Sequence, residues 1–119
     1  MDLYNFAYCW EAHEAWEGLW HEAENTYRLF LQGLIQVSAS LIKYHMRMLR
    51  PLRTLSTAGR DKLRQVVIEC DDASGNYMGL NLPVFLDTAD AFFAPFFADT
   101  VPETAYRQES VKPLILLMD

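Results

Sequence analysis

The sequence predicts an all-α fold: a four-helix bundle built around a long apolar second helix and followed by an extended C-terminal tail. Apolar residues recur at helical spacing in four segments, and asparagine, glycine or proline separates these segments. One of the segments is apolar around most of its circumference, as expected for a helix at the centre of a bundle. At 119 residues the chain has the commonest size of a single domain, so one domain over residues 1–119 is expected.

The first helix is expected to begin near residues 2–5, where Asp2 or Asn5 can cap it, and to run to about residue 24. Placing residues at 100° intervals gives it one apolar stripe, which is predicted to face the core. This stripe contains Ala12, Trp16, Leu19, Trp20 and Ala23.

The second helix is expected over residues 27–49, because the residue before Pro51 is disfavoured in the α region. It has one narrow polar stripe, which consists of Gln32, Gln36, Ser40, Lys43 and Arg47. Residues 51–59 are expected to form a connector because they contain serine, threonine and glycine, which favour turns.

A third helix is expected over residues 60–72, and Gly75 lies in the break that follows it. Asn81 is predicted to cap a fourth helix, with Pro83 in its first turn and Pro95 as its kink or end. The four phenylalanines of this region are predicted to be core residues, with a dimer contact as the alternative; they are Phe92, Phe93, Phe96 and Phe97.

Cysteine content and hydropathy indicate where the protein is located. Two cysteines do not make a disulfide framework, and the N-terminus has no pattern of a secretory signal, so a cytoplasmic protein is expected. The longest apolar stretch, residues 29–42, is shorter than the ~20 residues of a membrane span, so no membrane association is expected.

The charges are unevenly distributed along the chain. Residues 1–27 hold six acids and no lysine or arginine, whereas residues 43–64 hold seven basic residues. We expect the acidic helix and the basic segment to complement each other or to be solvated. Nucleic-acid binding is not expected, because the basic stretch lacks the interleaved aromatic residues on which bases stack.

Polar residues that could bind a ligand or transfer a proton gather on the first helix. His13, Glu14, Glu17 and His21 span about 100° of one face, with Trp10 within this stripe and Trp20 at its edge. Imidazoles and carboxylates at this spacing can share a proton or bind a divalent cation, with His13, Glu14 and Glu17 as the candidate metal ligands. The pattern fits neither the H-E-x-x-H zinc motif nor the Glu-x-x-His di-iron motif. A solvated or mutually satisfied face, a metal site and a polar ligand site therefore all stay open.

Two motifs resemble a known family. Residues 3–20, which contain E-A-H-E and end in L-W, resemble the opening signature of domain-of-unknown-function family 309. F-L-Q-G-L-I-Q at residues 30–36 is similar to the motif on that family's long helix, and Y-M-G-L-N at residues 77–81 is similar to an element before its last helix. Ala7 stands where a glycine is common in the family, and Met48-Leu49 replaces its usual Gly-Asn turn.

The resemblance implies a small all-helical protein of a kind often labelled a predicted metal-dependent hydrolase. The positions that it carries over are Glu11, His13, Glu14, Glu17, Trp20, Gln32, Gly33 and Gln36. A glycine inside a helix costs roughly 1 kcal/mol relative to alanine, so Gly33 is expected at a close helix approach. Gln32 and Gln36 would then either face His13 and Glu17 in one polar seam or form a solvated stripe.

Three functions are compatible with these observations. The first is a polar seam that binds a ligand or a divalent metal, the second is a metal-dependent hydrolase, and the third is a non-catalytic interaction module. A homodimer is also expected. The apolar run at residues 114–118, together with Tyr77 and the phenylalanines around Pro95, exceeds what a small core readily covers.

Overall fold

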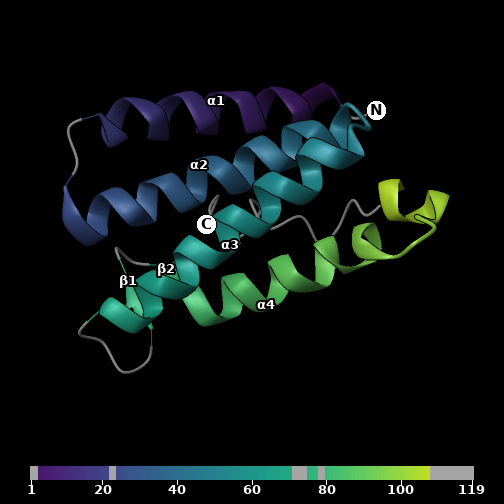
Figure 1. Cartoon of the computed structure of the whole chain (residues 1–119). Coiled ribbons are helices and arrows are strands. Elements are labelled where there is room, and N and C mark those ends of the chain that lie inside the picture. The colour runs from purple at the N-terminus through teal and green to yellow at the C-terminus, as the bar shows by residue number, and fades with distance from the viewer. Residues whose placement is uncertain (1–2, 22–23, 71–74, 78–79, 108–119) are drawn as a thin grey trace.

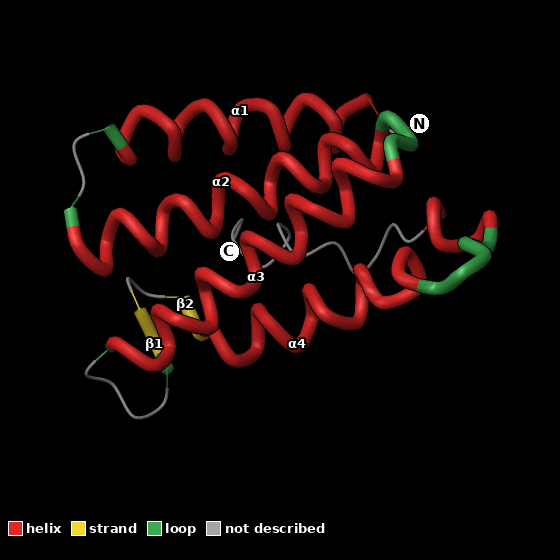
Figure 2. The backbone as a smooth tube through the Cα atoms, viewed as in Figure 1, coloured by secondary structure: helices red, strands yellow, loops and turns green. Residues whose placement is uncertain are grey.

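The protein is described by a computed structural model over residues 3–21, 24–70, 75–77 and 80–107. Its long helices are α1 (Leu3–Trp20), α2 (Asn25–His45), α3 (Leu49–Glu69) and α4 (Leu82–Phe93). Two short 3₁₀ helices follow, η1 (Ala94–Phe97) and η2 (Glu103–Arg107). The strands β1 (Asn76–Tyr77) and β2 (Leu80–Asn81) pair antiparallel between α3 and α4 (Figure 2). The predicted all-α class is confirmed, while this small hairpin was not expected.

Helix α2 has the central position that its apolar surface predicts. It lies between α1 and α3, and α4 lies along the far side of α3 (Figure 1). Its buried residues include Leu34, Val37 and Leu41, which join residues of α3, α4 and η1 in one core. Ser40, a member of the polar stripe, is also buried and donates its hydroxyl to the Val37 carbonyl at 2.6 Å.

The phenylalanines near Pro95 form an aromatic part of this core. Phe92, Phe93 and Phe96 are completely buried, and the ring of Tyr44 on α2 lies 5.1 Å from that of Phe92. Phe97 is 44% exposed. The prediction of a core role is therefore confirmed for three of the four. The apolar run at residues 114–118 lies outside the described residues.

Helix α1 is attached to the bundle along α2. Trp16 and Trp20 pack against the core, as their stripe predicts. Leu19 is 51% exposed, so its assignment to the core was wrong. The side chains of Ala12 and Ala23 lie outside the described part of the chain.

The junction between α2 and α3 differs from the prediction. α2 ends at His45 because Arg47 adopts a left-handed conformation with φ of 56°, and the Met48 N–H donates to the Lys43 carbonyl at 2.9 Å. The Arg47 N–H donates to the Tyr44 carbonyl at 3.1 Å, which completes a Schellman motif. A non-glycine residue thus occupies the position that glycine usually takes.

The predicted connector at residues 51–59 is helical instead. α3 begins at Leu49, which places Pro51 in its first turn. An N–H in the first turn has no partner within the helix, so proline is tolerated there, and the helix continues through the serine and threonine that were taken as turn formers. Ser56 is buried and donates its hydroxyl to the Arg53 carbonyl at 3.2 Å.

Two glycines allow α2 and α3 to cross at close range. A Cβ atom added to Gly33 would lie 2.8 Å from Cγ of Leu63, and one added to Gly59 would lie 2.9 Å from the Gly33 carbonyl oxygen. The close approach expected at Gly33 is therefore present. It involves α3, and its second member is Gly59, which the sequence had suggested for a turn.

The start of α4 follows the prediction. The Asn81 side chain accepts a hydrogen bond from the Val84 N–H at 3.2 Å, and Pro83 lies in the first turn. The helix ends at Phe93, two residues before Pro95, as expected from proline's missing donor. Gly75 has φ of 79°, and a Cβ added there would lie 2.7 Å from Cδ of Pro83.

Within the described residues, two arginines of the basic middle segment form ion pairs with α4, and none of the segment's ion pairs reaches the acidic α1. Arg64 binds both carboxylate oxygens of Asp90, at 2.5 and 2.6 Å, and Arg60 reaches the same carboxylate at 3.0 Å. Arg53 donates to the carbonyls of Phe96 and Ala98, at 2.6 and 3.0 Å. These cations hold α4 and η1 against α3.

The Asp90 ion pairs predict a loss of stability in acid. Burial raises the pKa of Asp90, but the hydrogen bonds from Arg64 and Arg60 outweigh this effect and hold that pKa below its usual value. A lowered pKa in the folded state stabilises the fold above the ordinary aspartate pKa, and this contribution is lost as pH falls through the folded value. Because the Asp90 side chain is 41% exposed, solvent screening limits the effect to about 1 kcal/mol.

Urea unfolding of wild type and Asp90→Asn between pH 3 and 7 measures this contribution. The difference between the two free energies of unfolding should be largest at pH 7 and should shrink in acid. Asp87→Asn serves as the control on the same helix. A constant difference across the range would contradict the ion-pair explanation.

Candidate functional site

The polar cluster on α1 is divided between the bundle and the solvent. The side chain of His13 is only 20% exposed and faces α2, whereas that of Glu17, one turn later, is 52% exposed. Glu11 and Glu14 are exposed on the same helix, and His21 is exposed directly after its last residue, Trp20. α1 therefore presents an acidic outer surface, with one imidazole turned inward.

His13 connects α1 to α2. Its Nδ1 lies 3.3 Å from the Ile35 carbonyl oxygen and 3.2 Å from the Ser38 hydroxyl, while its Nε2 lies 3.5 Å from Oε2 of Glu17. The Trp10 ring meets the imidazole edge-on at 6.2 Å between centroids. The imidazole thus has an inner nitrogen bound to α2 and an outer nitrogen beside a carboxylate.

The hydrogen bonds determine which nitrogen carries the proton. The Ser38 hydroxyl donates its only proton to the Ile35 carbonyl at 2.7 Å, so towards His13 it can only accept. Nδ1 therefore carries a proton and shares it between these two oxygens. In the neutral ring, Nε2 then presents a lone pair beside Glu17. In the charged ring, Nε2 donates a proton to that carboxylate.

The order Glu17, His13, Ser38 is that of a hydrolytic triad, but the geometry does not support nucleophilic catalysis. Ser38 is completely buried, and its proton is committed to a backbone carbonyl. A serine nucleophile must reach its substrate and give its proton to the histidine. Ser38 instead fixes the orientation of the His13 ring.

Trp20 and His21 lie one turn beyond Glu17 and form a separate group. Their rings meet edge-on at 5.3 Å between centroids, and the Arg28 guanidinium lies 4.1 Å above the Trp20 ring. Nε1 of Trp20 is buried and has no hydrogen-bond partner within the described residues. His21 is thus engaged by Trp20 rather than by the Glu17 carboxylate.

Gln36 of α2 does not join His13 in a polar seam. Gln36 accepts a hydrogen bond from Nζ of Lys62 on α3 at 2.8 Å. Gln36 precedes Ser38 by two residues, about 200° around the helix, so a side chain at this position points away from the face that holds His13. Gln32 is half-buried. The contacts found for Gln36 and His13 link α2 to different helices.

The candidate metal ligands supply a pair of donors. His13 Nε2 and Glu17 lie together, whereas no group of three His, Cys, Asp or Glu side chains suited to a metal ion occurs in the described part of the chain. Glu14 is exposed and adds no third donor to such a group. What the described residues offer a cation is therefore a two-donor site on the α1 surface.

Ser38 and the Ile35 carbonyl are the parts of this site that sequence reasoning missed. A serine within an otherwise apolar helix face was a usable signal, because a buried serine must find a hydrogen-bond partner. Its usual partner is a carbonyl one turn earlier in the same helix, which is the role of Ile35 here. The approach of His13 to this pair depends on how α1 packs on α2.

Comparisons with known proteins give one match. The family model described as Domain of unknown function (DUF309) matches residues 1–55, which contain α1, α2 and the start of α3. No curated protein and no solved structure matches the chain. None of the helices in the described residues combines the length and hydropathy needed to cross a membrane.

Proposed function

Residues 1–55 belong to the DUF309 family, and from this premise we propose that the edge formed by His13 and Glu17 on α1 binds a cationic ligand, in the simplest case a divalent metal ion. The observation that carries the proposal is the bond between His13 Nδ1 and the Ile35 carbonyl. Metal-binding histidines almost always donate their other ring N–H to a carbonyl or carboxylate, which fixes the tautomer and aims the free nitrogen. His13 has this arrangement.

The spacing of the two donors supports the same proposal. Zinc lies about 2.0–2.2 Å from histidine nitrogen and carboxylate oxygen, so two donors of a tetrahedral site are roughly 3.4 Å apart. Nε2 of His13 and Oε2 of Glu17 are 3.5 Å apart. A proton on Nε2 competes for this position, so cation binding should release a proton at any pH where the ring is charged.

A hydrolase is the more demanding form of this proposal. Catalytic zinc sites commonly use three protein ligands and keep one position for water. His13 and Glu17 supply two, so hydrolysis would require a third donor from outside the described residues or from a partner. A metal bound here would lower the pKa of its water. The contribution of this chain is to orient the His13 ring through Ser38 and Ile35.

Calorimetric titration of the tag-free protein with Zn²⁺, Mn²⁺ and Mg²⁺ tests the cation site. We expect one Zn²⁺ per chain, with the heat depending on the ionisation enthalpy of the buffer because a proton is released. Glu17→Gln should weaken Zn²⁺ binding by roughly tenfold or more. Mg²⁺, which prefers oxygen ligands, should bind more weakly than Zn²⁺.

Glu14→Gln on α1 and His21→Gln directly after it are matched controls, and both should bind as wild type does. Loss of binding in His21→Gln with retention in Glu17→Gln would move the site to the Trp20 end of α1. A titration without heat, together with an unchanged melting temperature in Zn²⁺, would remove the proposal. The chain would then be better explained as a non-catalytic interaction module.

We also propose that the chain self-associates as a homodimer in the cytoplasm. Several large apolar side chains are exposed, including Ile68 and Val84. Two cysteines do not make a disulfide framework, which supports a reducing compartment. Five basic residues of the middle segment have partners within the chain, which supports a role other than binding nucleic acid; they are Arg47, Arg53, Arg60, Lys62 and Arg64.

A further inference from the structure

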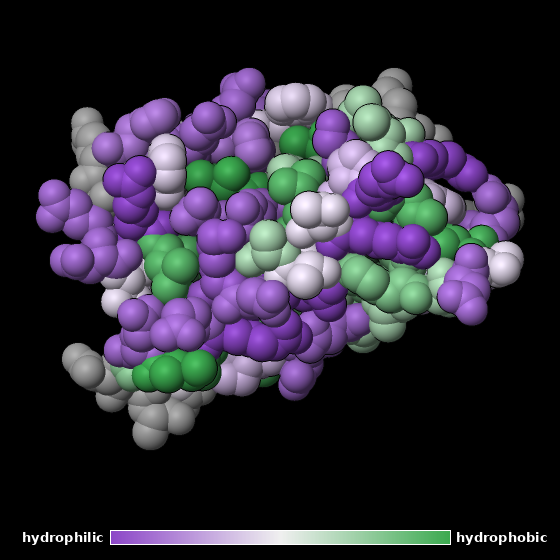
Figure 3. Space-filling model, viewed as in Figure 1, coloured by the Kyte–Doolittle hydropathy of each residue, from purple (hydrophilic) through white to green (hydrophobic). Residues whose placement is uncertain are grey.

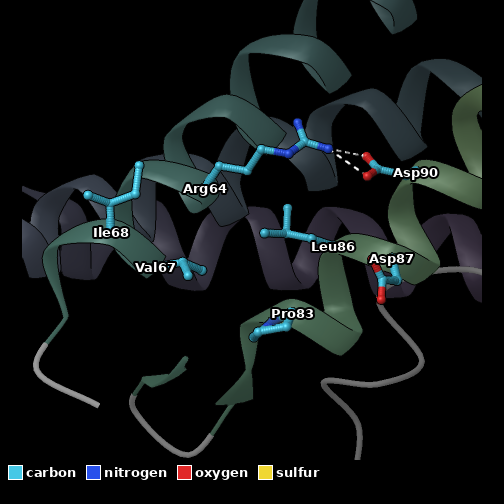
Figure 4. Close-up of a pocket in the computed structure, with 7 residues that line it drawn as sticks. All are labelled: Arg64, Val67, Ile68, Pro83, Leu86, Asp87 and Asp90. Atoms are coloured by element: carbon cyan, nitrogen blue, oxygen red, sulfur yellow. Dashed lines mark hydrogen bonds and ion pairs between the residues drawn. The ribbon is translucent and has the colours of Figure 1, made fainter. Parts of the chain in front are cut away.

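An open groove separates the end of α3 from the start of α4, on the other side of α2 from α1 (Figures 1 and 4). Its volume is about 340 Å³, and Val67, Ile68, Pro83 and Leu86 give it an aliphatic lining. Pockets for small ligands have volumes upwards of ~300 Å³ and are closed around convergent polar groups. This groove is open and mostly aliphatic, so it suits a side chain of another protein better than a small polar molecule.

The rim of the groove exposes an unusual amount of aliphatic surface. Ile68 is 76% exposed and Val84, which follows Pro83 on α4, is 50% exposed. Covering such side chains stabilises an assembly through the hydrophobic effect. Figure 3 shows hydrophobic side chains at the lower left, in the region of the end of α3, with hydrophilic side chains above them.

The charges at the groove have both signs. The Asp90 carboxylate is neutralised by Arg60 and Arg64, whose own side chain stays 44% exposed. Asp87 lines the groove, is exposed, and has no ion pair within the described residues. One face of the molecule therefore carries the exposed Ile68 beside the groove. The exposed Arg64 and the carboxylate of Asp87, which has no ion pair within the described residues, lie on the same face.

We infer that a second copy of this chain occupies the groove. A two-fold symmetric interface brings the same patch of both chains together, so the patch must be complementary to itself. Ile68 next to the groove meets this requirement, because each copy can insert its Ile68 into the hollow of the other. Arg64 of one copy then lies opposite Asp87 of the other. This inference rests on the proposed homodimer and assigns its surface.

Sedimentation equilibrium between about 5 and 100 µM tests the assignment. Wild type should approach twice the 13.8 kDa chain mass. Ile68→Glu should sediment as a monomer over the whole range, because it places a charge in the aliphatic groove of the partner. Asp87→Lys should dissociate less completely, with a loss of affinity that grows at low salt, where repulsion from Arg64 is least screened.

Leu19→Glu is the matched control, because Leu19 is 51% exposed on α1, away from the groove. It should dimerise as wild type does, and circular dichroism should show that each variant keeps its helix content. If Ile68→Glu stays dimeric, the homodimer holds but this surface is wrong. If wild type is monomeric, both the surface and the homodimer are wrong, while the cation site on α1 is unaffected.

Discussion

Phe92→Ala is expected to lower the free energy of unfolding by about 3–5 kcal/mol, because it opens a cavity in the aromatic core. Phe92 is completely buried and meets the rings of Tyr44, Phe93 and Phe96 at centroid distances of 5.1, 5.1 and 6.3 Å. Chemical denaturation of wild type and variant measures the difference.

Phe97→Ala is the control for this prediction, since Phe97 is 44% exposed and belongs to the same cluster of phenylalanines in the sequence. Its substitution should cost no more than about 1 kcal/mol, because little buried volume is removed. Equal costs at the two positions would mean that the aromatic core is packed differently from the structure described here.

Gly59→Ala is expected to destabilise the protein by about 1–3 kcal/mol, although alanine favours a helix by up to ~1 kcal/mol. The added methyl group would lie 2.9 Å from both the Gly33 carbonyl oxygen and the Val37 amide nitrogen. Both are backbone atoms of α2, so relief requires α2 and α3 to move apart.

Gly18→Ala on α1 is expected to change stability in the opposite direction. No heavy atom lies within 4 Å of a Cβ added at Gly18, so only the helix propensity acts, and stability should rise by up to about 1 kcal/mol. Thermal or urea unfolding of the two variants gives the sign directly. A stabilising Gly59→Ala would show that the helices do not cross at this position.

The His13 contacts show where sequence reasoning about the site stopped. The spacing of His13 and Glu17 predicted their proximity, because residues four apart lie on one helix face. It did not distinguish a solvated pair from a buried one. That depended on the packing of α1 against α2, which turns His13 towards Ile35 and Ser38 and leaves Glu17 half in solvent.

Gln36 on α2 shows the same limit. The sequence left open whether the glutamines face His13 and Glu17 or form a solvated stripe, because the periodicity of α2 does not state which neighbour lies against each face. Lys62 of α3 takes up Gln36 because α3 crosses α2 on that side, where Gly33 and Gly59 allow close contact.

The sequence by itself determined the helical class, the central place of α2 and the Asn81 cap of α4, because periodicity, overall apolarity and local side-chain hydrogen bonds act within one element. Only the tertiary structure decided that residues 51–59 are helical, that Gly59 meets Gly33 and that Asp90 gathers two arginines. Pro51 is compatible with a turn and with a first helical turn alike, and the packing of α3 on α2 selects the helix. Contacts between residues distant in the chain depend on how helices cross, and no local pattern encodes that crossing.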